Sequence, residues 1–365
     1  MTGKGDGNGS GDPTRYRIET RTRASMVLSL GGAALVLMLA ALPAFAGRGL
    51  IQDLIFVFYM LALAQCWNLL AGYAGLVSVG QQAFVGLGGY LLFALVIGAG
   101  FDPILAIVLS GLIAAVLAVP TGLVVFRLRG PYFAIGSWVV AEVYRLVFAQ
   151  FKGLGGGTGT SLPASATNGI FGIEWVKAAF EVRAPAARDI ITFWIALLLA
   201  AGAPLLVYLV LRSRVGLALF AIRDSEPTAE SAGVDGFRTK LGLYVLVAAA
   251  TAMIGALIHL QKASISPDAA FSVLDWTAYV IFIVVIGGVG TIEGPFVGVM
   301  VFYLLQRYLA DFGTWYLILL GALAIITMLI APKGIWGTLA QRTGIALFPL
   351  RRMLVRSYGS AYRSR

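Results

Sequence analysis

RSRVGLALFAIRDSEPTAESAGVDGFRTK, residues 212–240, is a polar stretch between two long apolar segments, and this contrast decides the fold. The flanking segments, 189–211 and 241–260, each match the roughly 20 apolar residues that a helix needs to cross a bilayer. Within hydrocarbon, a single segment can satisfy its own backbone hydrogen bonds only as a helix. The pattern therefore predicts two membrane-spanning helices joined by a loop outside the membrane.

Apolar segments of this kind recur along most of the chain. Hydrophobic residues make up 59% of the sequence and charged residues 12%, against roughly 25% charged residues in a soluble domain. We therefore predict an all-α, polytopic membrane protein with about ten transmembrane helices, of which the third, eighth and ninth are either broken or continuous. The predicted spans are 26–45, 50–70, 75–99, 104–126, 132–151, 189–211, 241–260, 276–291, 296–310 and 315–331.

The two ends of the chain differ from this apolar body. Residues 1–22 are Gly-rich and polar, which predicts a disordered tail, and residues 339–365 form a basic tail. The transmembrane domain is expected to occupy 23–338. The apolar run at 26–43 with the A-x-A pattern at 44–46 also resembles a signal peptide, but its long polar leader favours a first spanning helix.

Basic residues give the predicted orientation. If the N-terminus is cytoplasmic, 19 of the 27 Lys and Arg residues lie in cytoplasmic segments, so the positive-inside rule places both termini in the cytoplasm. Loop 212–240 is then cytoplasmic and loop 152–188 external, where a short helix is expected. Anionic lipid accounts for the net charge of +10 without nucleic acid as a partner. A bacterial-type inner (plasma) membrane is the expected location.

Several chemistries are excluded by residue types. Cys66 and His259 are the only cysteine and histidine, so the chain contains neither a catalytic triad nor a His/Cys metal site. No P-loop motif occurs, so ATP is not bound through one. We expect no cofactor, no metal and no enzymatic activity of the chain itself.

The middle of loop 212–240 predicts a short isolated helix. Asp224 or Ser225 is suited to cap its N-terminus, Pro227 fits its first turn, and Gly233 can end it in the left-handed conformation. A helix of about seven residues is marginal alone in water. It is therefore expected to dock against another protein.

The most distinctive intramembrane run is GYAGLVSVGQQAFVGLGGY, residues 72–90. Its polar side chains need partners in hydrocarbon, and glycine-interrupted segments that line a cavity are where transporters bind substrate. Close helix packing is an equally weighted alternative. The candidate substrate-path residues are Tyr73, Ser78, Gln81 and Gln82.

Other intramembrane features favour structural roles. Glu142 and Arg145, three residues apart in one span, predict a structural ion pair near the outer interface. Gly290, Gly294 and Gly298 predict a small-residue packing face beside a tight cytoplasmic turn around residue 293. Carboxylates are scarce within the spans, which argues against an ion-coupled secondary carrier.

Four blocks, in order, resemble the permease subunits of branched-chain (hydrophobic) amino-acid ABC importers, specifically the LivM-like branch. They are GYAGLVSVGQQAFVGLGGY, RLRGPYFAIGSWVVAEVYRLV followed by GGGTG, SRVGLALFAIRDSEPTAESAGVDGFRTKLGLYV, and ISPDAAF leading to VVIGGVGTIEGPFVG. They cover most of residues 70–300. Any one block is weakly specific, but the ordered combination is specific.

This resemblance implies a permease fold of the vitamin-B12-importer type, which imports branched-chain or other hydrophobic amino acids. It also implies a second homologous permease, two ABC ATPase subunits and an extracytoplasmic solute-binding protein. The third block is similar to the family's ATPase-coupling loop, and Pro227 and Glu230 depart from the family pattern. The implied coupling residues are Arg223, Asp224, Glu226, Ala229, Glu230 and Gly233.

Three alternatives to amino-acid import remain open. Related permeases that import urea, short amides or another small neutral solute share these blocks. An ion-coupled secondary carrier would lack the coupling-type loop. A purely structural membrane scaffold would leave the polar, glycine-rich run at 72–90 without a reason.

Overall fold

The computed structural model describes residues 16–19, 23–309, 312–343 and 353–356, and most of them are helical. The prediction of an all-α polytopic membrane protein is confirmed, and each predicted span overlaps a helix. Within the described residues, eight helical segments are long and apolar enough to cross a membrane. They are Arg48–Tyr73, Gln81–Gly98, Pro103–Val125, Pro131–Ala149, Ala184–Arg212, Gly236–Lys262, Pro267–Gly287 and Leu317–Arg342.

Helix α2 (Arg48–Asn68) is the centre of the bundle. Its apolar window is 89% buried, whereas that of α5 (Pro131–Ala149) at the periphery is 17% buried. Helix α2 packs against α8 (Ala184–Arg212), and α11 (Gly236–Lys262) packs against α3 (Gln81–Phe93) and α4 (Pro103–Val125). Gln65 and Asn68 of α2, and Gln81 and Gln82 of α3, are therefore enclosed by other helices.

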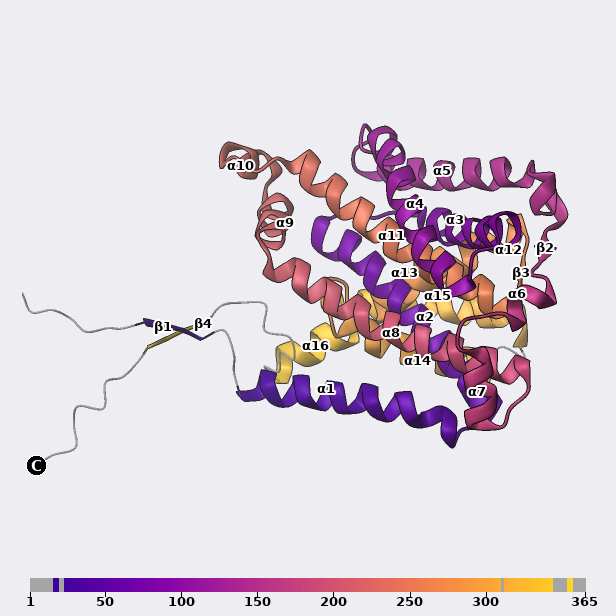
Figure 1. The fold of residues 1–365 in the computed structure, drawn as a ribbon. Coiled ribbons are helices and arrows are strands. Elements are labelled where there is room, and N and C mark those ends of the chain that lie inside the picture. The colour runs from indigo at the N-terminus through magenta and orange to yellow at the C-terminus, as the bar shows by residue number, and fades with distance from the viewer. Residues whose placement is uncertain (1–15, 20–22, 310–311, 344–352, 357–365) are drawn as a thin grey trace, which may run out of the picture.

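The connecting elements gather at two opposite ends of the bundle (Figure 1). Helices α9 and α10 lie at one end, and β2, β3, α6 and α7 lie at the other. Their bounds are α6 (Ala164–Asn168), α7 (Ile173–Phe180), α9 (Arg214–Asp224), α10 (Glu226–Ser231), α12 (Pro267–Ala270), β2 (Thr160–Ser161) and β3 (Ser264–Ile265). The helices of the second half are α13 (Tyr279–Gly287), α14 (Gly294–Leu309), α15 (Thr314–Ile330) and α16 (Gly334–Thr343).

Local sequence signals set several helix ends. The Asp102 carboxylate accepts from the backbone N–H of Ile104 (2.8 Å) and caps α4, with Pro103 in the first turn. Asp235 caps α11 in the same way, through the N–H of Arg238 (2.9 Å). These caps satisfy N–H groups that would otherwise lack a partner at helix starts.

The third predicted span begins later than expected. Helix α2 passes into a π-helical turn, η2 (Leu69–Tyr73), and irregular backbone follows over 74–80 before α3 starts at Gln81. Gly75 has φ +69°, a conformation that glycine adopts without a Cβ penalty. The predicted start at residue 75 was wrong because hydropathy alone does not register this break.

The turn predicted around residue 293 lies between α13 and α14, over 288–293. Gly294 and Gly298 belong to α14, and a methyl group on Gly298 would lie 1.8 Å from the Ile283 carbonyl oxygen of α13. Gly290 lies in the turn, with φ +74°. Small residues thus allow α13 and α14 to approach closely beside the predicted turn.

Few residues of the two predicted tails are described. β1 (Tyr16–Glu19) pairs antiparallel with β4 (Met353–Arg356), and α1 (Arg23–Ala41) follows β1. The rest of 1–22 and most of 339–365 lie outside the described residues. The predictions for these tails stay predictions.

Candidate functional site

The irregular segment 74–80 is held in place by side chains from two helices. The Trp67 indole N–H of α2 donates to the Ser78 carbonyl (2.8 Å), and the N–H of Val79 donates to the Ser137 hydroxyl of α5 (3.0 Å). A methyl group on Gly80 would lie 2.1 Å from the Ser137 carbonyl oxygen. The break in the helix is therefore a fixed, hydrogen-bonded structure that depends on a glycine at this contact.

The candidate path residues at the start of α3 are buried and incompletely paired. The Gln81 amide donates to the Leu63 carbonyl (3.0 Å), and the Thr277 hydroxyl donates to the Gln82 side-chain oxygen. Gln81 Oε1, Gln82 Nε2 and the Tyr73 hydroxyl are buried without a partner in the described part of the chain. A buried polar atom without a partner costs about 1–3 kcal/mol, so these atoms are unusual for a purely structural cluster.

An internal cavity lies beside these residues. Ser78, Gln81 and Trp67 line it, together with Tyr244 and Thr251 of α11. Its volume of about 10 Å³ is roughly that needed for one water molecule. The cavity is too small for an amino acid, so the candidate path is closed here in this conformation.

A row of amides on α2 binds the turn between α13 and α14. The Gln65 side chain donates to the Ile292 carbonyl (2.7 Å), and the Asn68 side chain donates to the Thr291 carbonyl (2.8 Å). The Gly290 N–H donates back to Asn68 Oδ1 (2.8 Å). Buried amides thus satisfy backbone groups that leave the helical pattern, as required within a membrane.

The polar loop is connected to the same place. Arg223, next to last in α9, donates through Nη1 to the Gly72 carbonyl (2.8 Å), across 151 sequence positions. A methyl group on Gly72 would lie 2.6 Å from the Gly290 backbone nitrogen. The end of α9, the start of the helix break and the α13–α14 turn therefore meet at Gly72.

Helix α10 follows the sequence prediction closely. Ser225 is its N-terminal cap residue, Pro227 lies in the first turn, and Gly233 adopts φ +86° after the last turn. The Ser225 hydroxyl bonds the Thr228 hydroxyl (2.8 Å) rather than a backbone N–H. The helix has six residues, and α9 beside it was not predicted because its apolar and polar residues show no clear periodicity.

The coupling candidates of loop 212–240 divide into exposed and buried side chains. Asp224, Glu226 and Glu230 are exposed, and Glu226 pairs with Lys240 of α11 (2.6 Å). Ala229 is 4% exposed and packs within the chain. A partner protein can reach the three carboxylates but not Ala229.

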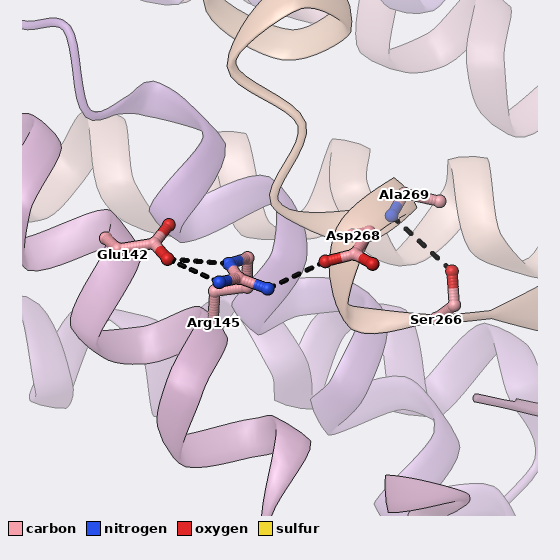
Figure 2. A network of polar contacts seen from close by, with 5 residues as sticks. All are labelled: Glu142, Arg145, Ser266, Asp268 and Ala269. Carbon is pink, nitrogen blue, oxygen red and sulfur yellow. Dashed lines mark hydrogen bonds and ion pairs between the residues drawn. The ribbon is translucent and has the colours of Figure 1, made fainter. Parts of the chain in front are cut away.

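Glu142 and Arg145 form an ion pair on α5, as Figure 2 shows. Arg145 Nε lies 2.9 Å from Glu142 Oε1, and Arg145 Nη1 lies 2.7 Å from the Asp268 carboxylate of α12. The hydroxyl of Ser266 accepts from the Ala269 N–H and caps α12. All three charged side chains are partly exposed, so the network ties α5 to α12 with a contribution of about 1 kcal/mol or less per pair.

Three buried polar residues of this site were not among the sequence candidates. Gln65 and Asn68 of α2 and Thr277 of η6 (Leu274–Ala278) are each 0% exposed. The two amides stand three residues apart inside the apolar run 50–70, which places them on one helix face. That spacing was a usable signal, whereas nothing local marks Thr277. No cluster of three metal-ligating side chains occurs within the described ranges.

Comparison with known proteins shows similarity to permeases of one transport family. The family profile described as the permease component of the branched-chain amino acid transport system matches residues 49–328. The high-affinity branched-chain amino acid transport system permease protein LivM of Escherichia coli K12 is 28% identical over 318 residues, which cover 83% of this chain and 73% of that protein. Its Salmonella typhimurium counterpart gives the same values.

A more distant relative comes from an archaeon. The probable branched-chain amino acid transport permease protein LivM of Methanocaldococcus jannaschii is 26% identical over 213 residues, which cover 57% of this chain and 55% of that protein. No solved structure matches the chain significantly.

Proposed function

Because the chain belongs to the branched-chain amino acid transport permease family, we propose that it is the transmembrane permease subunit of an ABC importer. In this role it forms part of the path for branched-chain or other hydrophobic amino acids. The names of the relatives favour amino acids over urea or short amides. The unpaired atoms of Gln81, Gln82 and Tyr73 support a polar path at the start of α3.

Loop 212–240 is proposed as the site where partner ATPases act. One observation supports this proposal above all. Helix α10 is exposed, and Arg223 at the end of the adjacent helix α9 donates a hydrogen bond to Gly72, which lies just before the helix break that precedes α3. Asp224, Glu226 and Glu230 offer exposed carboxylates to basic residues of an ATPase. The transporter would comprise this chain, a second homologous permease, two ATPase subunits and an extracytoplasmic binding protein, with ATP hydrolysed by partner chains.

The proposed orientation follows from charge. The loop with α9 and α10 carries Arg212, Arg214, Arg223, Arg238 and Lys240, so the positive-inside rule puts this end of the bundle in the cytoplasm. The opposite end, with β2 and β3, would face outward. A bacterial-type inner membrane with both chain termini cytoplasmic is consistent with this arrangement.

Energy source and subunit dependence test the proposal together. Deletion of the gene in its source organism should abolish a component of leucine uptake that ATP depletion also removes. The purified chain alone, reconstituted in vesicles, should neither hydrolyse ATP nor move leucine. Uptake by the lone chain under a proton or sodium gradient would refute the proposal.

A further inference from the structure

A cavity of about 260 Å³ opens at the end of the bundle opposite α9 and α10. It lies among the end of α11, the paired strands β2 and β3, and α12. One water molecule needs roughly 10–15 Å³ of such space, so this cavity has room for a small solute such as leucine. This cavity is separate from the closed path beside Gln81.

One cation is available at the rim. The Lys262 ammonium lies 4.9 Å from the centre of the Trp276 ring, and a cation at that distance is held over an aromatic face. No carboxylate of the described residues lies within 4.0 Å of this ammonium. Lys262 therefore offers positive charge to the cavity without a counter-ion in direct contact.

Residues with hydroxyl side chains line the same space. They include Thr160, Ser161 and Ser264 of the paired strands β2 and β3. Each hydroxyl can donate one hydrogen bond and accept others. A cation beside hydroxyl donors can bind a small carboxylate through charge-assisted hydrogen bonds.

The inner wall provides an acceptor. His259 Nδ1 lies 2.8 Å from the Gly255 carbonyl oxygen, which can only accept, so Nδ1 carries the proton. In the neutral ring Nε2 is then an acceptor. Gly89 leaves room for this ring, since a methyl group there would lie 2.6 Å from Nδ1. Ile265 and Ala269 supply apolar surface beside these polar groups.

We propose that this cavity is a receiving site for an α-amino acid, with Lys262 as the counter-ion of its carboxylate and His259 Nε2 as an acceptor for its ammonium group. The hydrogen-bond donors would bind the carboxylate of a small aliphatic amino acid, the acceptor would bind its ammonium group, and the apolar surface would contact its side chain. The identity of the solute rests on the proposed function. The site itself rests on the cavity and its lining.

The proposal is tested in the assembled transporter in native membranes. A reporter cysteine is introduced as Ser264→Cys in a Cys66→Ala background, and its labelling by a neutral maleimide is timed. Leucine is expected to slow labelling, whereas leucinol, which has the same side chain and amine but no carboxylate, is expected to leave it unchanged. Ser161→Cys serves as a second reporter if the first variant does not reach the membrane.

The role of Lys262 is tested by adding Lys262→Gln to the reporter chain. Protection by leucine should be lost, and half-maximal leucine uptake should require about tenfold more leucine. Lys177→Gln is the matched control, because Lys177 lies on α7 at the same end and is paired with Glu174. It should change neither measurement.

The possible outcomes separate this inference from the proposed function. Unchanged protection in Lys262→Gln, or equal protection by leucinol, would overturn the carboxylate site. Protection by the solute-binding protein but not by free leucine would identify a protein contact and would also overturn it. In these cases chain-dependent leucine uptake would persist, whereas absence of that uptake in the unmodified transporter would refute the proposed function.

Discussion

Replacing Arg223 tests whether α9 transmits motion to the helix break. The Arg223→Met variant keeps an apolar stem of similar length but removes the hydrogen bond to the Gly72 carbonyl (2.8 Å). A hydrogen bond from a charged donor contributes about 1.5–3 kcal/mol, and the lower end applies because Arg223 as a whole is exposed. About 1.4 kcal/mol corresponds to a tenfold change in the equilibrium between the linked and unlinked arrangements.

The expected result is specific to coupling. Because its guanidinium donates to the Gly72 carbonyl within the chain, Arg223→Met should retain the ATPases on purification while uptake per ATP hydrolysed falls by about tenfold. Arg238→Met is the control, since this exposed arginine of the same loop forms an ion pair, among the described residues, only with Asp235 of the same helical turn (3.0 Å). It should leave both measurements near the unmodified values.

Two results would contradict this reasoning. Wild-type uptake per ATP in Arg223→Met would mean that the hydrogen bond to Gly72 carries no coupling. Loss of the ATPases from Arg223→Met would mean that Arg223 contacts a partner directly. Membrane level and thermal stability of the variant, measured in detergent, separate either outcome from misfolding.

Three further variants probe the coupling helix, the path and the packing. Gly233→Val places a β-branched residue at φ +86°, at a cost of about 1–2 kcal/mol. The variant should insert normally into the membrane but show weaker ATPase co-purification and weaker uptake. Full retention of both would show that α10 does not couple the ATPases to transport. Gln82→Cys in a cysteine-free background should be labelled to an extent that changes with the transport state, and uniform protection in every state would mean that the residue only packs. Gly88→Ala adds a methyl group 1.9 Å from the Ala252 carbonyl of α11, so we expect the folded state to lose about 1–3 kcal/mol of stability and to unfold at a lower temperature in detergent. Gly202→Ala, with open space around it, is the control. Equal unfolding temperatures of the two variants would contradict the close approach of α3 and α11.

The fold class and helix α10 were predictable because their signals are local. An apolar run about 20 residues long is expected to form a helix in lipid, because a single segment satisfies its own backbone hydrogen bonds there only as a helix. Likewise, the helix-end preferences of Ser225, Pro227 and Gly233 depend on the residue type alone and not on distant contacts. The positions of α10 and its left-handed end accordingly agree with the structure.

The neighbours of each helix were not predictable in this way. The contact of Arg223 with Gly72 joins residues 151 positions apart, and that of Gln82 with Thr277 joins residues 195 apart. Periodicity specifies which face of a helix is apolar but not which helix covers it.

The contacts at Gly72 give the buried Asn68 amide of α2 a structural role. Asn68 fixes the turn at Gly290, Gly72 lies against the same turn, and Arg223 reaches the Gly72 carbonyl. The irregular segment 74–80 starts only two residues later, and Gln81 of the candidate path follows it directly. A displacement of α9 would therefore act at one end of this segment, without passing through the packed bundle. Hydrogen bonds on both sides of Gly72 would direct that displacement into 74–80, where the bonds of Ser78 to Trp67 and of Val79 to Ser137 hold the backbone in place of a helical ladder.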